Sequence, residues 1–288
     1  MTTAGKWVAG ARPRTLPAAI VPVVVGTAVA DAGGPVIWWR SVCALVVALG
    51  IQIGTNYAND YSDGVRGTDA ERVGPVRLVA AGLASPSAVK AASLVAFAVA
   101  GVAGLVLALF TTPWLILVGA VCFAAGWFYS GGSRPYGYAG FGEVFVFAFF
   151  GLVAVVGTAY VNIGHITALA VTASIPVGFL ATALLVVNNL RDIETDRNAG
   201  KKTLAVRAGP RATRGLYATL VLGSFVMVLV IALRRPVALI ALAALAAAVA
   251  PLRRVLGGAK GRDLVEALAA TGMLQLAFGA LLALGIVL

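Results

Sequence analysis

Long apolar stretches, separated by short polar or Pro/Gly-rich breaks, dominate the pattern along this chain. A helix that crosses a bilayer needs about 20 mostly apolar residues, with a range of roughly 17 to 25. Nine stretches come close to this length, at residues 15–31, 36–57, 87–110, 113–130, 141–161, 166–190, 213–233, 236–253 and 264–287. The pattern therefore predicts an all-α, polytopic transmembrane bundle of about nine helices that forms a single domain over residues 1–288.

The composition agrees with a chain that is solvated by lipid rather than by water. Of its 288 residues, 60% are hydrophobic and 11% are charged, against about 25% charged residues in a soluble domain. A formal net charge of +11 would suit a nucleic-acid binder, but no basic patch interleaved with aromatic residues is present. We therefore expect the lipid bilayer, and no nucleic acid, as a partner.

The basic residues are divided unequally between the two sides of the predicted bundle. With the N-terminus in the cytoplasm, all of the 22 Lys and Arg residues face inward except Arg40, Arg234 and Arg235. Cytoplasmic segments of membrane proteins carry such an excess of positive charge. We expect a multi-pass protein of the cell (plasma) membrane, with a cytoplasmic N-terminus and an outward-facing C-terminus.

Most acidic residues gather in two polar segments that follow the second and sixth predicted helices, on the cytoplasmic side. They are Asp60, Asp63, Asp69 and Glu71 within residues 56–77, and Asp192, Glu194 and Asp196 within residues 187–207. Asp60 and Asp63 are three residues apart, and Asp192 and Asp196 are four apart. On a helix each pair shares one face.

These paired carboxylates predict a bound cation, because like charges on one helix face repel each other. Nearby amide oxygens can complete the ligand set, from Asn56, Asn59, Asn188 and Asn189. Oxygen ligands without histidine or thiolate favour Mg²⁺, which binds proteins through one or two carboxylates together with substrate phosphates.

Basic residues within or beside both acidic segments predict an anionic substrate. They are Arg66, Arg77, Arg191, Arg197, Lys201 and Lys202. Arg and Lys bind phosphate oxygens, so such a site at the bilayer surface suits a diphosphate head with a hydrocarbon tail. The alternative is a pair of solvated, mixed-charge loops without a ligand. Two equivalent clusters with helical spacing argue against this alternative.

These residues resemble the UbiA-type superfamily of intramembrane prenyltransferases, whose motifs read N-D-x-x-D-x-x-x-D and D-x-x-x-D. Asn59, Asp60 and Asp63 match the opening of the first motif, and Asp192 and Asp196 match the second in full. The last Asp of the first motif would fall at Gly67, and Asp69 follows two residues later. The segments NDYSDGVRGTD, SGGSRPYGYAGFGEVFVFAFFG and NNLRDIETDRNAGKKTLAVR are similar to the branch that prenylates 1,4-dihydroxy-2-naphthoate in menaquinone synthesis.

The resemblance implies a nine-helix bundle whose central cavity opens to the cytoplasmic side beneath two Asp-bearing loops. It also implies Mg²⁺-dependent transfer of a polyprenyl chain from its diphosphate to 1,4-dihydroxy-2-naphthoate. Diphosphate and CO₂ are lost, and the product is demethylmenaquinol. One metal would be held by Asn59, Asp63 and Asp69, and the other by Asp192 and Asp196. Asp60 would be a supporting ligand or a group that holds the ligands in place from behind.

Aromatic and basic residues near the fourth and fifth predicted helices are candidates for the rest of the site. Tyr136 and Tyr138, with Trp127, Phe128 and Tyr129, could stabilise an allylic cation or could be ordinary interfacial aromatics. Either Arg134, or Arg12 together with Arg14, could pair with the carboxylate of the acceptor. Glu143 could stabilise a helix N-terminus or help to deprotonate a naphthol hydroxyl.

Three alternative functions stay open. Another acceptor such as 4-hydroxybenzoate would keep the superfamily but change the branch. A cation-coupled transporter would carry its acids at mid-membrane depth within discontinuous helices, whereas these acids lie at one rim beside Arg and Lys. A transferase that uses CDP-alcohols would need its own Asp/Gly/Arg/Ser pattern, which the chain does not contain.

Overall fold

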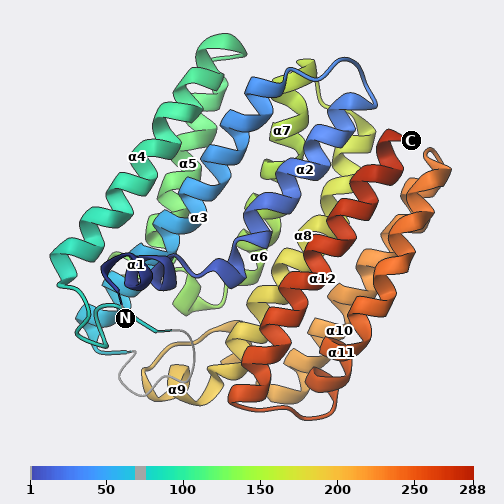
Figure 1. Cartoon of the computed structure of the whole chain (residues 1–288). Coiled ribbons are helices and arrows are strands. Elements are labelled where there is room, and N and C mark those ends of the chain that lie inside the picture. Colours follow the sequence, from blue (N-terminus) through green and yellow to red (C-terminus); the bar gives the residue numbers. More distant parts are fainter. Residues whose placement is uncertain (1, 69–75) are drawn as a thin grey trace.

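The computed structural model describes residues 2–68 and 76–288, and within these ranges the chain is helical and contains no strand. Its elements are α1 (Thr3–Ala11), η1 (Pro13–Thr15), α2 (Pro17–Asp31), α3 (Trp38–Arg66), α4 (Pro86–Phe110), α5 (Trp114–Phe128), η2 (Gly137–Ala139), α6 (Gly142–Val146), η3 (Phe147–Val153), α7 (Ala154–Ile163), α8 (Ala168–Arg191), α9 (Ile193–Asn198), α10 (Leu204–Ala232), η4 (Pro236–Ala244), α11 (Leu245–Leu256) and α12 (Arg262–Val287). The long helices run side by side as one bundle (Figure 1).

All nine apolar stretches form helices, and the prediction of a polytopic membrane bundle is confirmed. Seven helical segments among the described residues are long and apolar enough to cross a membrane. The pair Thr3–Thr15 and Pro17–Asp31, bent by 56°, makes an eighth if it counts as one span. Helix α5 is apolar but has only 15 residues, which is short for a span. The exact number of nine spans therefore stays a prediction.

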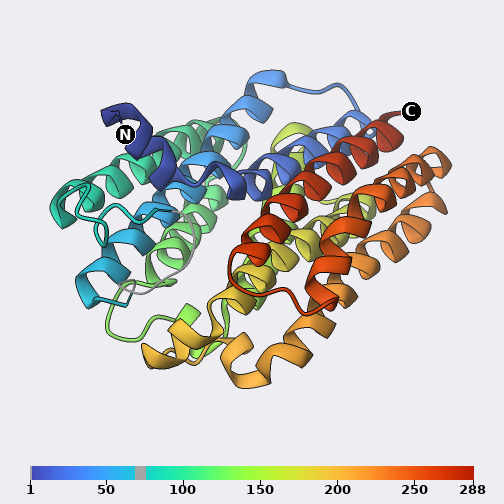
Figure 2. The ribbon, with the colours of Figure 1, turned by 60° about the horizontal axis from the view of Figure 1, so that its bottom comes forward.

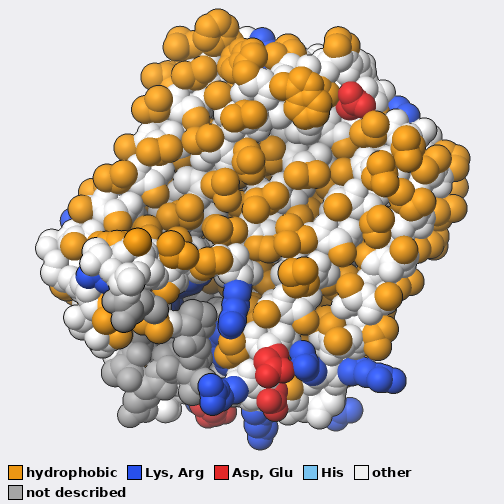
Figure 3. Space-filling view, viewed as in Figure 1, with side chains coloured by type: hydrophobic (Ala, Val, Ile, Leu, Met, Phe, Trp, Pro, Cys, Tyr) orange, Lys and Arg blue, Asp and Glu red, His pale blue; other side chains and the backbone are white. Residues whose placement is uncertain are grey.

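Charged side chains gather at one end of the bundle, which we call the charged end. In Figure 3 they cluster at the bottom, while apolar side chains cover most of the rest of this face. The C-terminal end of α3 and the short helix α9 both lie at this end (Figures 1 and 2). The fold thus brings the two acidic segments to the same end of the bundle.

Two helices extend further than the apolar pattern predicts. Helix α3 continues through Arg66, well past the predicted end at residue 57, and Gly67 closes it with a left-handed φ of 70°. Helix α10 begins at Leu204 instead of residue 213, with a kink at Gly209. The first acidic motif therefore lies on the last turns of a helix, and the expectation of an Asp-bearing loop at Asp60 and Asp63 was wrong. Polar residues that face the protein interior continue a helix as well as apolar ones do.

Helix α8 is the central element of the bundle. Of its most apolar 18-residue window, 72% is buried inside the protein, more than for any other described span. It packs against α2, α10, α12 and η3, and small residues such as Ala173, Ser174 and Gly178 let these neighbours approach closely. Because α8 ends at Arg191, its packing fixes the start of the second acidic motif.

The span at residues 142–163 contains a π-helical segment, η3, at Phe147–Val153. Phe145, Phe149, Val153 and Gly157 all line the central cavity, at intervals of four residues. A regular α-helix of 3.6 residues per turn would rotate such a series off one face. The wider π turns offset part of this rotation. The π segment therefore keeps a continuous stripe of this span on the cavity wall.

Gly151 of this π segment packs against the backbone of α8, and it gives a test of the packing. A Cβ at Gly151 would lie 2.6 Å from the Gly178 Cα, which is backbone and cannot move aside, whereas a Cβ at Gly157 would meet nothing within 4 Å. We expect Gly151→Ala to destabilise the protein by about 1–3 kcal/mol, seen as a lower thermal midpoint in detergent. Gly157→Ala is the matched control. Equal midpoints for the two variants would contradict this packing.

Candidate functional site

One large cavity of about 850 Å³ lies inside the bundle. Its lining comes mainly from α2, α3, α4, α5, α6, η3, α7 and α8, with residues of η1 and α9, and it extends from Lys201 at the charged end to Val161 near the end of α7. Charged and amide side chains line the charged end, which we call the mouth, and apolar side chains line most of the remainder, which we call the body. Such a cavity suits a ligand with a charged head and an apolar tail.

The side chain of Lys201 joins the two acidic motifs at the mouth. It is 7% exposed, and its Nζ lies 3.5 Å from Asp63 Oδ1 and 3.5 Å from Asp196 Oδ1. The backbone places it there, because the Lys201 N–H donates to the Asp196 carbonyl over 2.8 Å after the left-handed turn at Gly200. Arg77 adds a second cation, with Nη2 3.6 Å from Asp63 Oδ2. Carboxylates far apart in the sequence thus share one set of buried cations.

Asp192 lies at the junction between α8 and α9 and is held by its neighbour Arg191. The Arg191 Nε and Nη2 atoms donate to the two carboxylate oxygens of Asp192, each over 2.7 Å. Nη2 also donates to Asn188 Oδ1 over 2.8 Å. Among the described residues, the buried Nη1 has no hydrogen-bond partner. Because Arg191 lines the cavity, this donor suits an anionic group of a ligand.

Tyr138 connects the two motifs from the loop between α5 and α6. Its hydroxyl donates to Asp63 Oδ1, and the Lys201 Nζ lies 4.6 Å from the centre of its ring. The Lys202 N–H donates to the Tyr138 carbonyl over 2.8 Å. Burial, together with the charge of Asp63, raises the pKa of the Tyr138 hydroxyl above its ordinary value. The hydroxyl therefore keeps its proton and stays a hydrogen-bond donor at neutral pH.

The structure brings most of the predicted site residues together on the cavity wall. Those that line it are Asn56, Asn59, Asp63, Arg77, Tyr136, Tyr138, Asn188, Asn189, Arg191, Asp192, Asp196 and Lys201. The spacing arguments for both acidic motifs thus predicted residues that do converge in space. What these residues bind stays a prediction.

Asp60 lies behind the cavity wall, as a group that supports the ligands would, and not on it, as a ligand would. It is fully buried and does not line the cavity. Its carboxylate accepts hydrogen bonds from the backbone N–H groups of Leu78 over 2.7 Å and Val79 over 3.0 Å. It holds the chain after the first motif against α3, and so keeps Arg77 at the mouth. The helical pattern put Asp60 near Asp63 but could not show which partner it faces.

Three other predicted substrate-binding residues also lie off the cavity wall. Arg66 donates to the Ser130 and Gly132 carbonyls and so fastens the α5–α6 loop to α3. Arg134 and Lys202 are exposed. Asp69, predicted as a metal ligand, lies outside the described residues.

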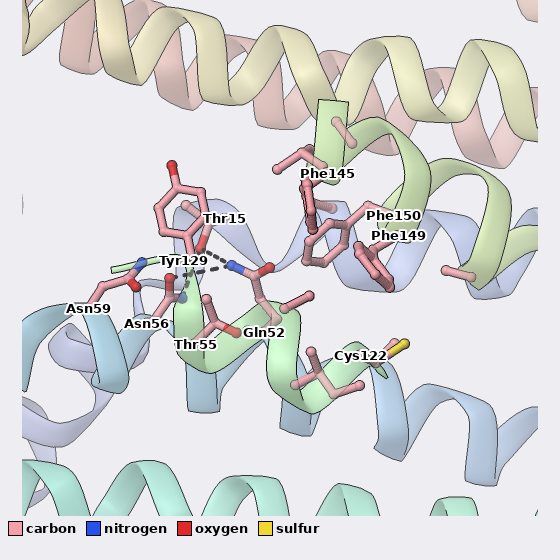
Figure 4. A pocket seen from close by; sticks show the side chains of 18 of the residues that line it. Thr15, Gln52, Thr55, Asn56, Asn59, Cys122, Tyr129, Phe145, Phe149 and Phe150 are labelled. Atoms are coloured by element: carbon pink, nitrogen blue, oxygen red, sulfur yellow. Dashed lines mark hydrogen bonds between the residues drawn. The ribbon is translucent and has the colours of Figure 1, made fainter. Parts of the chain in front are cut away.

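A polar network deeper in the cavity was only partly predicted. Asn56 donates to the Ala11 carbonyl over 2.9 Å and to Thr15 Oγ1 over 3.1 Å, and Gln52 also donates to Thr15 Oγ1 over 3.1 Å. Figure 4 shows Gln52, Thr55 and Asn56 on one wall, opposite Phe145, Phe149 and Phe150. The signal in the sequence was polar residues at helical spacing, Gln52, Thr55, Asn56 and Asn59, within an otherwise apolar stretch.

Aromatic side chains cover the wall opposite this network, next to the mouth. The Tyr136 ring stacks on Phe145 with centroids 4.0 Å apart, and Tyr129 meets Tyr136 edge-on at 5.5 Å. Tyr129, Tyr136, Phe145, Phe149 and Phe150 line the cavity, whereas Trp127 and Phe128 do not. The phenylalanines were missed because the sequence does not show which face of a wholly apolar span looks inward.

The donor set at the mouth fits a hard divalent cation. Within residues 2–68 and 76–288, no group of three His, Cys, Asp or Glu side chains is close enough to form a metal cluster by itself. Asp63, Asp192 and Asp196 nevertheless face one cavity, and their neighbours there offer amide oxygens without histidine or thiolate. Mg²⁺ binds in this way, with few carboxylates and with substrate phosphates completing its shell.

The fold is shared with solved structures of remote sequence. A UbiA homologue from Aeropyrum pernix K1, in its apo form, matches with a TM-score of 0.71 at 14% identity, over 94% of this chain and 97% of that one. A UbiA homologue from Archaeoglobus fulgidus bound to GPP and Mg²⁺ matches with a TM-score of 0.65 at 18% identity, over 98% and 99%. These likenesses establish the architecture of the bundle.

Closer relatives are found among curated proteins. The 1,4-dihydroxy-2-naphthoate octaprenyltransferase of Mycobacterium tuberculosis is 49% identical over 96% of this chain and 94% of its own length. The enzyme of the same name from Escherichia coli is 36% identical over 76% of this chain and 74% of its own length. Residues 19–274 match the UbiA prenyltransferase family. With this match, and with both acidic motifs on one cavity, the chain belongs to the UbiA prenyltransferase family.

Proposed function

We propose that this chain transfers a polyprenyl group from its diphosphate to 1,4-dihydroxy-2-naphthoate, with loss of diphosphate and CO₂, to give demethylmenaquinol for menaquinone synthesis. The names of its relatives support the acceptor and the donor class. The observation that carries the proposal is a mouth where Lys201 bridges Asp63 and Asp196, above an apolar body. The acids gather at one end of the bundle, whereas a cation-coupled transporter would carry them at mid-membrane depth, so the arrangement does not support a transporter.

The mouth would receive the diphosphate. Lys201, Arg77 and the Nη1 of Arg191, which has no partner in the described part of the chain, can donate to phosphate oxygens. Asp63, Asp192 and Asp196, with Asn59, would hold Mg²⁺, and Asp69 would belong to this set if it also faces the mouth. When bound, Mg²⁺ would neutralise negative charge on the leaving diphosphate. The buried bases serve the same purpose from the protein side.

The body of the cavity would hold the start of the hydrocarbon chain and exclude water. An allylic carbon that loses diphosphate becomes electron-poor and would be captured by any water beside it. The stacked rings of Tyr136 and Phe145 present aromatic faces next to the mouth, and such faces attract positive charge by about 0.5–2 kcal/mol. The cavity wall can therefore favour attack by the aromatic acceptor over attack by water.

We also propose that the protein lies in the plasma membrane and that its charged end faces the cytoplasm. The uneven distribution of Lys and Arg supports this orientation. It would place the mouth where water-soluble dihydroxynaphthoate and Mg²⁺ are available, while the prenyl tail arrives from the lipid.

Transfer by the purified protein tests the function. Protein in detergent, given a labelled polyprenyl diphosphate, 1,4-dihydroxy-2-naphthoate and Mg²⁺, should form demethylmenaquinol, measured by mass spectrometry. Removal of Mg²⁺ with a chelator should abolish the product. Asp63→Asn and Asp192→Asn should each lower kcat/KM at least about 100-fold, as expected when electrostatic help to a leaving group is lost.

The matched control is Asp31→Asn, which changes an exposed acid at the end of α2, off the cavity wall. It should leave the rate within about twofold. Product from 4-hydroxybenzoate but not from dihydroxynaphthoate would keep the reaction class and reject this acceptor. Transfer that persists in both motif variants would reject the proposed roles of the acids.

The neighbours Lys201 and Lys202 give a second test, because one is buried at the mouth and the other is exposed. Lys201→Met removes the cation that bridges Asp63 and Asp196, so we expect KM for the prenyl diphosphate to rise at least tenfold, about 1.4 kcal/mol. Lys202→Met removes a charge of the same kind one residue away and should change KM less than twofold. Equal effects of the two substitutions in a steady-state assay would refute the specific position of Lys201.

A further inference from the structure

A buried pair of polar side chains lies just below the mouth, one from α6 and one from α8. The Asn189 Nδ2 donates to Glu143 Oε1 over 2.9 Å. Glu143 is 6% exposed and Asn189 is 7% exposed. Asn189 precedes Asp192 by three residues on α8, so it lies about one turn deeper than the second acidic motif. The sequence pattern predicts the Asn189 amide oxygen as a possible ligand of the cation, but neither residue belongs to the diphosphate site proposed above.

Glu143 differs from the acids at the mouth in the partner that it has. Asp63 and Asp196 contact Lys201, and Asp192 contacts Arg191, whereas the partner of Glu143 is an amide. The Asn189 amide turns its NH₂ group toward Glu143, because Nδ2 is the donor of this hydrogen bond and Glu143 Oε1 is the acceptor. Its carbonyl oxygen, Oδ1, then points away from Glu143.

The Asn189 Oδ1 atom is therefore a hydrogen-bond acceptor at the cavity wall. Asn189 lines the cavity, and no residue in the described ranges donates a hydrogen bond to its Oδ1. If only hydrocarbon covered this oxygen, leaving it without a hydrogen bond would cost about 1–3 kcal/mol of binding free energy. A diphosphate offers only acceptor oxygens and would be repelled. The ligand that suits this position carries a hydroxyl or another donor.

The ring of Tyr129 lies beside the start of α6, next to Glu143. A Cβ placed on Gly142, next to Glu143, would lie 3.3 Å from both Oη and Cε2 of Tyr129. In Figure 4 the Tyr129 hydroxyl points away from the Thr15–Gln52–Asn56 network, and Tyr136 connects Tyr129 to Phe145 on the same wall. An aromatic ring that carries a hydroxyl would pack on these faces and reach Asn189 with its O–H.

We propose that Asn189 Oδ1 accepts a hydrogen bond from a ring hydroxyl of the aromatic acceptor, and that Glu143 is the positioning residue that fixes the Asn189 amide. This inference rests on the proposed function. It adds a specificity-determining contact for the acceptor, separate from the groups that bind diphosphate and Mg²⁺.

Asn189→Leu keeps the size of the side chain and removes the acceptor oxygen. We expect KM for dihydroxynaphthoate to rise at least tenfold, while KM for the prenyl diphosphate changes less than twofold. As inhibitors, 1-hydroxy-2-naphthoate and 4-hydroxy-2-naphthoate each lack one hydroxyl of the substrate. The wild type should bind one of them at least tenfold more weakly than the other, and Asn189→Leu should erase this difference, which a purely structural role would not do.

Glu143→Gln tests the positioning role without changing shape. A glutamine can present either end of its amide, so Asn189 is no longer held in one direction, and KM for the acceptor should rise by less than in Asn189→Leu. Thr182→Val is the matched control, because Thr182 is buried on α8, bonds to its own helix at Gly178 and does not line the cavity. It should leave both KM values and both inhibition constants unchanged.

Assays of the wild type test the proposed function, and assays of the two variants test the role of Asn189 and Glu143. If the wild type transfers prenyl groups to no hydroxylated aromatic acid, the proposed function fails and takes the inference with it. If the wild type is active but Asn189→Leu and Glu143→Gln raise KM for the diphosphate, or keep the preference between the two monohydroxy compounds, the inference alone is overturned. Should Asn189→Leu not fold, Glu143→Gln decides by the same readouts.

Discussion

The buried ammonium group of Lys201, 3.5 Å from carboxylates of two distant motifs, is the interaction on which the site depends. A charge taken out of water is costly unless it is paired, so Lys201 can stay buried because Asp63 and Asp196 both neutralise it. Because Asp63 belongs to α3 and Asp196 to α9, this pairing ties the two halves of the bundle at one end. The same cluster can accept a diphosphate with its metal, because Lys201 can bind the phosphate oxygens and the carboxylates of Asp63 and Asp196 can bind the metal ion.

Around this pairing the fold separates two environments within one cavity. The mouth is polar and is built by helix ends: the last turns of α3, the α8–α9 junction and the α5–α6 loop held by Arg66. The body is mostly apolar. One wall carries the Thr15–Gln52–Asn56 network, and the π segment keeps an aromatic stripe of the span 142–163 facing inward on the other. A substrate with an anionic head and a hydrocarbon tail has to cross this boundary at its allylic carbon. The reacting bond would therefore lie where charge stabilisation and exclusion of water meet.

Much of this arrangement could be predicted from sequence, and the exceptions have physical causes. Apolar length predicted the helical segments, and the spacing of Asp63, Asp192 and Asp196 predicted carboxylates that converge. Asp60 has the same spacing but bonds to the backbone of Leu78 and Val79, since helical periodicity does not say which tertiary partner a side chain meets. The end of α3 at Arg66 was missed because hydropathy shows where the apolar residues end, and the helix continues beyond them. Gln52 and Phe145 were missed because position on a cavity wall follows from packing between helices.

Both acidic motifs should bind the same diphosphate at the mouth. A structure of the protein with a bound prenyl diphosphate analogue would show whether they do. The protein would be imaged by cryo-electron microscopy in a lipid nanodisc with Mg²⁺ and a non-reactive thio analogue of a prenyl diphosphate. We expect density for the diphosphate between Asp63 on one side and Asp192 and Asp196 on the other, with Lys201 and Arg191 in contact and the tail in the apolar body. Density for the diphosphate at another site, or contacts with one motif alone while the other keeps its present ion pairs, would contradict this expectation.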